Sequence, residues 1–282
     1  MAARRTIARD VVVSGIALHS GAPVTMRLRG AIAGEGIRFC RTDLSDRPVI
    51  DATWQNIVDS RLATVIGKDG ITVAVTEHLL AAIAGAELDD VLIEIDGPEL
   101  PLLDGDAASF LTLLDGAGIH EQRCHRETIV VHRPITVHSG GSSAGLRPSA
   151  RAEFWFEIDF PGTAIGHQTF ELRMDAQTFR NEIAPARTFG FLNQAEELRK
   201  AGLARGASLE NTIVIDGERI CNPGLQRFGD EFVRHKILDA IGDLKLAGAP
   251  IAGRFEGRRS SHALNAALLR ALFADPGNYK RV

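Results

Sequence analysis

The segment from residue 234 to 243 most constrains how this chain can fold, because it joins a helix pattern to a row of polar side chains. His235, Asp239 and Asp243 follow one another at four-residue intervals and therefore lie along one helical face. Apolar residues lie on roughly the opposite side: Ile237, Ile241 and Leu244. The polar face either meets solvent or supplies metal ligands. Gly242 lies beside this polar face and favours the metal-ligand interpretation, because exposed helix faces usually carry Lys, Glu and Gln.

The composition is that of a globular protein, neither disordered nor membrane-spanning. Of its 282 residues, 45% are apolar and 24% charged, and the length favours two domains. A net charge of −4 argues against general affinity for nucleic acid but allows a local basic pocket for a phosphorylated ligand. Three cysteines without a Cys-x-x-Cys pair fit a reducing compartment and disfavour a cysteine-based zinc site. The basic first ten residues lack the apolar run of a secretory signal, so we expect the protein to be located in the cytoplasm.

The first half of the chain is predicted to mix short strands with two helices. The strands are expected at 11–13, 24–28, 72–75 and 91–95, separated by Gly, Pro and Asp turn residues. One helix begins after Thr76, which we expect to cap it, and stops at Gly85. The second covers residues 107–117.

The second half repeats this mixture after a polar, basic segment at 122–127, where we place the domain boundary. Strands are expected near 129, 135, 154–158 and 212–215, and helices at 175–183, 193–201, 234–244 and 262–274, the last capped by Ser260 or Ser261. Residues 139–142 read as a hairpin turn or loop. Without a regular βαβ alternation, the pattern indicates an α+β fold with domains 1–124 and 128–282.

A catalytic zinc generally has three protein ligands, so a further ligand must join His235 and Asp239 from elsewhere in the chain. Every other histidine is a candidate. His78 stands out because Glu77 precedes it at a helix start, which would set a carboxylate able to activate water beside a ligand. The remaining histidines stay open as alternatives, although isolated surface histidines are commonly inert.

Two long motifs resemble a known enzyme family. Residues 75–82 (Val-Thr-Glu-His-Leu-Leu-Ala-Ala) and 230–244 are similar to the two metal-site motifs of the UDP-3-O-acyl-N-acetylglucosamine deacetylases. Further motifs of that family follow in the same order at 18–21, 102–108, 186–191 and 261–265. Together they cover essentially the whole chain. Two departures, Ser260-Ser261-His262 for the usual Ser-Gly-His and Asp104-Gly105-Asp106 for the common Asp-Gly-Ser, remove no expected catalytic group.

The resemblance implies two similar β-α-α-β layered domains, each with a small insert, and an active site between them. It implies one Zn²⁺ per chain with His78, His235 and Asp239 as ligands, and catalytic roles for further residues. Glu77 would be the general base and His262 the acid, while Thr188 would stabilise the oxyanion with the zinc. Asp243 would orient His262, and Lys236 would assist near the site.

The implied substrate is a UDP-linked, acylated amino sugar. The resemblance places the acyl chain along residues 189–209, and it places the nucleotide and its phosphates near an aromatic and a basic residue. The implied substrate contacts are Phe160, Phe189, Phe191, Leu203 and Arg259. Each assignment has a structural alternative, since an aromatic side chain or Thr188 can simply pack in the core, His262 can simply start a helix, and Lys236 or Arg259 can simply meet solvent.

The resemblance therefore implies zinc-dependent hydrolysis of the N-acetyl group of UDP-3-O-(3-hydroxyacyl)-N-acetylglucosamine, in lipid A biosynthesis. Two alternatives stay open: a metal amidohydrolase for a different acylated amino sugar, and a non-catalytic carbohydrate-binding or scaffold protein with a structural metal. Glu77 and His262 argue against the latter, because structural zinc needs neither a base nor an acid. We expect a monomer with no nucleic-acid partner and no stable membrane insertion, although the lipid chain of the substrate permits weak peripheral association.

Overall fold

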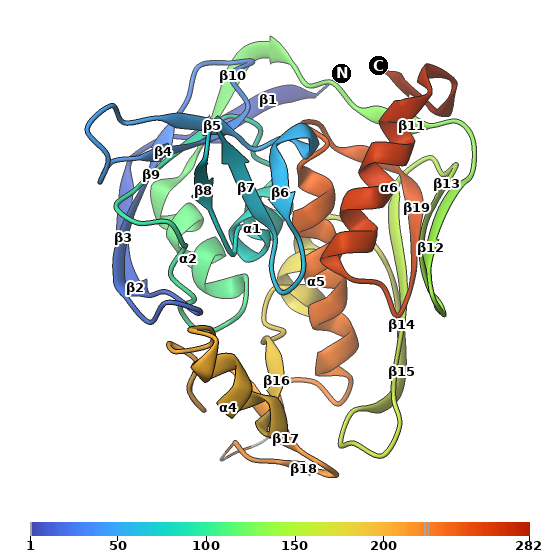
Figure 1. Ribbon diagram of the computed structural model, residues 1–282. Helices are drawn as coiled ribbons and strands as arrows, with labels where there is room; N and C mark the ends of the chain where they lie inside the picture. The colour runs from blue at the N-terminus through green and yellow to red at the C-terminus, as the bar shows by residue number, and fades with distance from the viewer. Residues whose placement is uncertain (1, 223, 225) are drawn as a thin grey trace.

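The structure is a computed structural model that describes every residue except 1, 223 and 225. Each half of the chain forms a main β-sheet, a pair of helices and a small additional sheet, as Figure 1 shows. The expected α+β class is confirmed. Two central helices, α1 (Glu77–Gly85) and α5 (Glu231–Lys245), lie between the main sheets of the two halves (Figure 1).

The main sheet of the N-terminal half has the strand order β2-β3-β9-β4-β5. Its strands are β2 (Val11–Ile16), β3 (Pro23–Gly30), β4 (Ile37–Arg41), β5 (Val49–Asp51) and β9 (Val91–Ile95). In β3, Val24, Met26 and Leu28 are buried and alternate with more exposed residues, which is why this segment forms a strand with one face on the core. Helix α2 (Ala108–Ala117) packs beside α1, and the small sheet consists of β6 (Ile57–Asp59), β7 (Val65–Lys68) and β8 (Ile71–Val73).

The main sheet of the C-terminal half is mixed and centred on β19 (Ile251–Arg258), which pairs in parallel with β11 and β14 and antiparallel with β13. The other strands are β11 (Ile129–Val131), β12 (Ile135–Ser139), β13 (Ser142–Arg147), β14 (Ala152–Phe160), β15 (Gly166–Arg173) and β20 (Tyr279–Arg281). Helices α5 and α6 (His262–Ala274) pack on this sheet. The small sheet consists of β16 (Phe189–Phe191), β17 (Ile213–Asp216) and β18 (Arg219–Ile220), with α4 (Leu192–Lys200) beside it.

The connection between the halves is short. Strand β10 (Ile119–His125) pairs with β1 (Ala3–Ile7), whereas β11 pairs with β19 and β20. The backbone hydrogen bonds therefore change from the first half to the second between residues 125 and 129. This pattern supports our proposal that the domains are 1–124 and 128–282.

Three short helical segments complete the described chain: η1 (Trp54–Asn56), α3 (Ala176–Thr178) with the π-turn η2 (Phe179–Ile183), and η3 (Pro276–Asn278). The helix expected at 175–183 is thus a short α-turn capped by Asp175 that widens into a π-turn. Among the described residues, none of the helices combines the length and hydropathy needed to span a membrane.

Near α1, the expected end at Gly85 is confirmed and the expected cap at Thr76 is wrong. Thr76 occupies the N-cap position but has helical dihedrals, and its hydroxyl donates to the Thr64 carbonyl 3.2 Å away instead of accepting from the first turn of α1. Gly85 does end α1, but its φ is not positive. A Cβ at Gly85 would come within 2.0 Å of the Phe179 ring, so close packing, not a left-handed cap, requires glycine there.

Helix α5 is buried on nearly all sides, which excludes the solvated polar face. Only Arg234 and Lys236 of this helix are not buried, and the His/Asp face contacts α1 and α6. The helices approach closely at Gly242, where an added Cβ would lie 2.0 Å from the Glu77 carbonyl oxygen. Because Gly242 has no side chain, α5 can approach the first turn of α1 this closely.

We expect Gly242→Ala to destabilise the protein by about 1–3 kcal/mol, because the new methyl group meets backbone that cannot move without separating α1 from α5. Urea unfolding measures this change. The matched control is Gly116→Ala, on the exposed face of α2 with open space around it, which should raise stability by up to about 1 kcal/mol. An unchanged unfolding midpoint for Gly242→Ala would contradict the close contact.

Candidate metal centre and active site

Three buried side chains from both halves converge on one point. His78 comes from α1, and His235 and Asp239 come from successive turns of α5; each is no more than 4% exposed. Their potential ligand atoms all lie within 4.8 Å of one another. Asp239 Oδ1 lies 3.3 Å from His235 Nε2 and 3.6 Å from His78 Nε2.

These atoms fit a tetrahedral metal site. Zinc bonds of about 2.0–2.1 Å place neighbouring ligand atoms about 3.3 Å apart, close to both measured separations. Asp239 Oδ1 is buried between the imidazoles and has no hydrogen-bond partner among the described residues. This oxygen is therefore available to bind a cation. Two imidazole nitrogens and one carboxylate oxygen form the donor set of a catalytic zinc site.

Neighbouring groups fix the protonation of these candidate ligands. His235 Nδ1 lies 3.1 Å from the Ala186 carbonyl, which accepts its hydrogen and leaves Nε2 with a free lone pair. Burial lowers the pKa of His235 to about 4, so the ring is neutral at pH 7, as a ligand must be. Burial opposes the charge of Asp239, yet the His235 ring and the Lys236 ammonium, 2.6 Å from Oδ2, hold its pKa well below the usual value.

Two further titratable groups face the same point. Glu77, the first residue of α1, is buried, and its Oε2 accepts a hydrogen bond of 3.1 Å from the backbone of Thr64. Burial raises its pKa above the ordinary value, although nearby histidines oppose the shift. His262 starts α6, where the Ser261 hydroxyl caps the helix, and its Nε2 lies 3.9 Å from Glu77 Oε1 and from Asp239 Oδ2.

Asp243 holds the His262 ring. Its Oδ2 lies 2.9 Å from His262 Nδ1. Burial disfavours the charged ring, but this carboxylate outweighs it and raises the pKa of His262 to about 9. At neutral pH the site therefore combines a cationic imidazole with a carboxylate of raised proton affinity, the pairing expected of a general acid and a general base.

A cavity of about 290 Å³ exposes this arrangement to a ligand. Its walls come from both halves of the chain. The lining residues are Leu18, Leu62, Val75, Glu77, His78, Phe160, Thr188, Phe189, His235, Lys236, Asp239, Ser260 and His262. Val75 is itself unusual, since this β-branched residue adopts a left-handed φ of 60° immediately before Thr76 and Glu77. Such backbone strain is typically found at functional sites.

Comparison with known proteins agrees with this geometry. The family model of LpxC, UDP-3-O-acyl N-acetylglycosamine deacetylase, matches residues 4–274. The chain belongs to this family. A UDP-3-O-acyl-N-acetylglucosamine deacetylase of Myxococcus xanthus is 46% identical over 280 residues, covering 99% of this chain and 89% of the relative. Deacetylases of the same name from Phenylobacterium zucineum and Nitratiruptor are 46% and 45% identical over 279 residues, with 95% and 93% of their lengths covered.

Most residues that the deacetylase motifs singled out lie together. The metal and acid–base groups line the cavity with Thr188, Lys236, Phe160 and Phe189. Phe191 lies behind Phe160, with ring centroids 5.6 Å apart. Leu203 and Arg259 do not line the cavity; Arg259 is exposed, and its guanidinium donates to the Gly141 carbonyl at 2.8 Å.

Two residues that support the site were not singled out from the sequence. Thr64 donates its backbone N–H to Glu77 and its hydroxyl to Asp243 Oδ1, so one residue contacts both the expected base and the carboxylate behind the expected acid. Asn265 donates from Nδ2 to Asp243 Oδ2 at 2.8 Å. Asn265 lies one helical turn after His262, and this spacing could have indicated that Asn265 supports the site. No local sequence pattern marks Thr64.

Proposed function

We propose that this chain hydrolyses the N-acetyl group of UDP-3-O-[(3R)-3-hydroxyacyl]-N-acetylglucosamine, releasing acetate and the free amine, the committed step of lipid A biosynthesis. Membership of the deacetylase family supports this reaction. The observation that carries it is the position of Glu77 and His262, 3.9 Å apart on the cavity that also contains the His78, His235 and Asp239 cluster. A structural metal site would need neither group.

His78, His235 and Asp239 would hold one zinc ion per chain. When bound, zinc supplies Lewis-acid activation of water and of the amide carbonyl. The neutral imidazoles and the ionised carboxylate suit it. Lys236 keeps Asp239 Oδ2 occupied, which leaves Oδ1 directed toward the two imidazoles.

The acid–base steps follow from the protonation of the remaining groups. Glu77 would accept a proton from the water that attacks the amide carbon, and its raised pKa makes it a stronger base. His262, held protonated by Asp243, would donate from Nε2 to the departing amine nitrogen. The Thr188 hydroxyl would donate to the carbonyl oxygen as negative charge develops on it.

Aromatic residues beside the cavity would bind the rest of the substrate. Phe160, Phe189 and Phe191 form a contiguous cluster, and Phe189 also packs edge-on to His235 at 6.2 Å. This cluster would receive the uridine or the start of the acyl chain. Leu203 would extend the acyl passage, and Arg259 would contact phosphate from outside the cavity.

Acetate release tests the reaction. The UDP-linked acylated sugar should react at least tenfold faster than the same acylated sugar without its nucleotide, because only the former uses nucleotide contacts. Equal rates would instead indicate an amidohydrolase for a different acylated amino sugar. Absence of acetate from both substrates with zinc-loaded protein would exclude the proposed activity.

Thr64 provides a finer test of the same site. We expect Thr64→Val to lower kcat about tenfold with KM changed less than twofold, because it removes the hydroxyl bond to Asp243 but keeps the backbone bond to Glu77. The matched control, Thr64→Ser, retains both bonds and should keep kcat within about threefold. Equal kcat values for the valine and serine variants would show that the hydroxyl does not position Asp243.

The nucleotide-linked substrate class supports a cytoplasmic location for the proposed reaction. We propose that the protein acts as a monomer, because one chain supplies the whole metal and acid–base set from its own two halves. Only the acyl chain of the substrate would bring it near a membrane, as weak peripheral association.

A further inference from the structure

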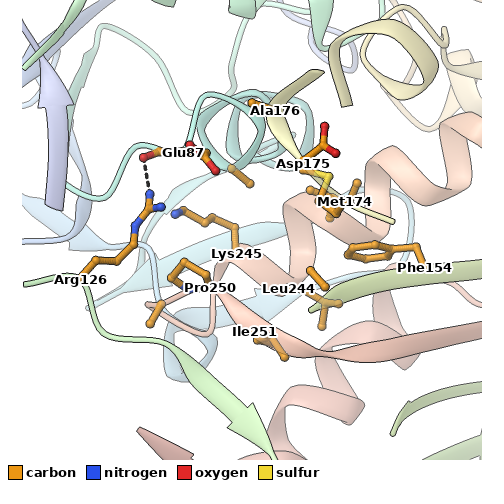
Figure 2. Close-up of a pocket in the computed structure, with 14 residues that line it drawn as sticks. Glu87, Arg126, Phe154, Met174, Asp175, Ala176, Leu244, Lys245, Pro250 and Ile251 are labelled. Carbon is orange, nitrogen blue, oxygen red and sulfur yellow. Dashed lines mark hydrogen bonds between the residues drawn. The ribbon is translucent and has the colours of Figure 1, made fainter. Parts of the chain in front are cut away.

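A second cavity, of about 170 Å³, lies between the two halves and shares no lining residue with the metal cavity. Figure 2 shows it among the end of α1, the C-terminal part of α5, the connection between the halves and the segment that follows β15. Its position on the opposite ends of α1 and α5 separates it from the proposed reaction.

Most of the wall is apolar. The lining includes Phe154, Met174, Leu244, Pro250 and Ile251, which Figure 2 labels. Four alanines complete the apolar part of the wall with Ile241. A cavity of about 150 Å³ with similar lining can hold benzene, so this space suits an apolar group of about six carbon atoms. Transfer of such a group from water is favourable at roughly 25 cal/mol per Å².

The lining of this cavity includes a buried cation, Lys245. Lys245 is 8% exposed, and its Nζ donates to the Leu88 carbonyl at 2.8 Å. It forms no ion pair within the described part of the chain. An ammonium group has three N–H donors, so Lys245 retains donor capacity for a further acceptor. Burial lowers the pKa of Lys245 to about 8, which leaves it mostly protonated at pH 7.

The carboxylates around Lys245 are already neutralised. Asp89 binds the Arg126 guanidinium at 2.8 Å, and Asp90 binds Arg4 at 2.7 Å. Among the described residues, Lys245 therefore has no carboxylate of its own to pair with. A buried charge without a partner is unfavourable, and an anionic ligand would relieve that cost.

The two acidic residues of the rim do not replace such a ligand. Glu87 is paired with Arg5 at 2.7 Å, and its side chain is 43% exposed. Asp175 is exposed and caps the start of α3, where its Oδ1 accepts the backbone N–H of Thr178. Both carboxylates are thus exposed to solvent and already have hydrogen-bond partners.

We propose that this cavity binds a small amphipathic carboxylate of about six carbon atoms, with its carboxylate accepting hydrogen bonds from Lys245 and its apolar tail against Phe154, Met174 and Leu244. The ligand would contact Ala84 at the end of α1 and Ile241 and Leu244 of α5. It therefore stabilises the contact between the two helices whose other ends carry the metal ligands.

Hexanoate is the probe for this site, and calorimetric titration into the full chain measures its binding. A carboxylate can also bind a metal, so the titration is performed with metal-free protein and with zinc-loaded protein. We expect saturable binding of similar affinity in both forms. Acetate, which lacks the tail, and hexan-1-ol, which lacks the charge, should each bind at least tenfold more weakly.

Lys245→Met should weaken hexanoate binding at least tenfold, because it keeps the side-chain volume but removes the ammonium. Lys68→Met, at an exposed lysine of β7, is the matched control and should bind as the unmodified chain does. Ala176→Leu partly fills the cavity while keeping Lys245, so it should also weaken binding and decides the question if Lys245→Met fails to fold.

The proposal is overturned if metal-free protein does not bind hexanoate, if Lys245→Met binds it as tightly as the Lys68→Met control, or if binding requires zinc. The last result would place the carboxylate in the metal cavity. Electron density for hexanoate beside Lys245 in a crystal of the complex would support the proposed position directly.

Discussion

Replacing Glu77 by glutamine is expected to lower kcat at least hundredfold while leaving zinc content unchanged. Glutamine has the same shape and can still accept the Thr64 N–H bond, but it cannot take a proton from water. General base catalysis typically contributes about 10²–10⁴-fold, which sets the size of the loss. Acetate release and metal analysis on the same preparation separate the two properties.

The matched control for Glu77→Gln is Glu196→Gln, which changes an exposed carboxylate of α4 that pairs with Lys200. It should keep full activity. A Glu77→Gln enzyme with normal turnover would remove Glu77 from the role of base, and one that lost its zinc would show that this carboxylate supports the metal rather than the chemistry.

His235→Ala is expected to abolish stable zinc binding and, with it, measurable turnover. The substitution removes one of the three proposed protein ligands and also the hydrogen bond from the ring to the Ala186 carbonyl. Zinc content after dialysis is the measurement. His167→Ala changes an exposed histidine of β15 and should retain the metal. Equal zinc content in both variants would show that the ligand assignment is wrong.

Local patterns in the sequence predicted much of the fold. Residues 91–95 form the expected strand and residues 262–274 the expected final helix, because a short apolar run followed by turn residues in the first and a serine cap in the second are local signals. Strand β10 was not predicted, since it is largely exposed and polar and is stabilised by pairing with β1, more than a hundred residues away in sequence. Such partners are invisible to a periodicity argument.

In the functional site too, local features could be predicted from the sequence, whereas contacts between distant residues could not. The four-residue spacing of His235 and Asp239 and the adjacency of Glu77 and His78 are local features, so the sequence could indicate them as a group. The bond from Thr64 to Asp243 joins residues 179 positions apart and has no local signature. The expected helix cap at Thr76 failed for a related reason, since its hydroxyl bonds to that same Thr64 segment.

The proposed metal ligands are divided between the two halves, with His78 from one and His235 and Asp239 from the other. An ion held by all three is therefore also a non-covalent cross-link, and its binding free energy adds to the docking of the halves. Chelation would loosen the association of one half with the other as well as stop catalysis. If these residues hold the ion, metal supply would shift the folding equilibrium of the whole chain toward the folded state.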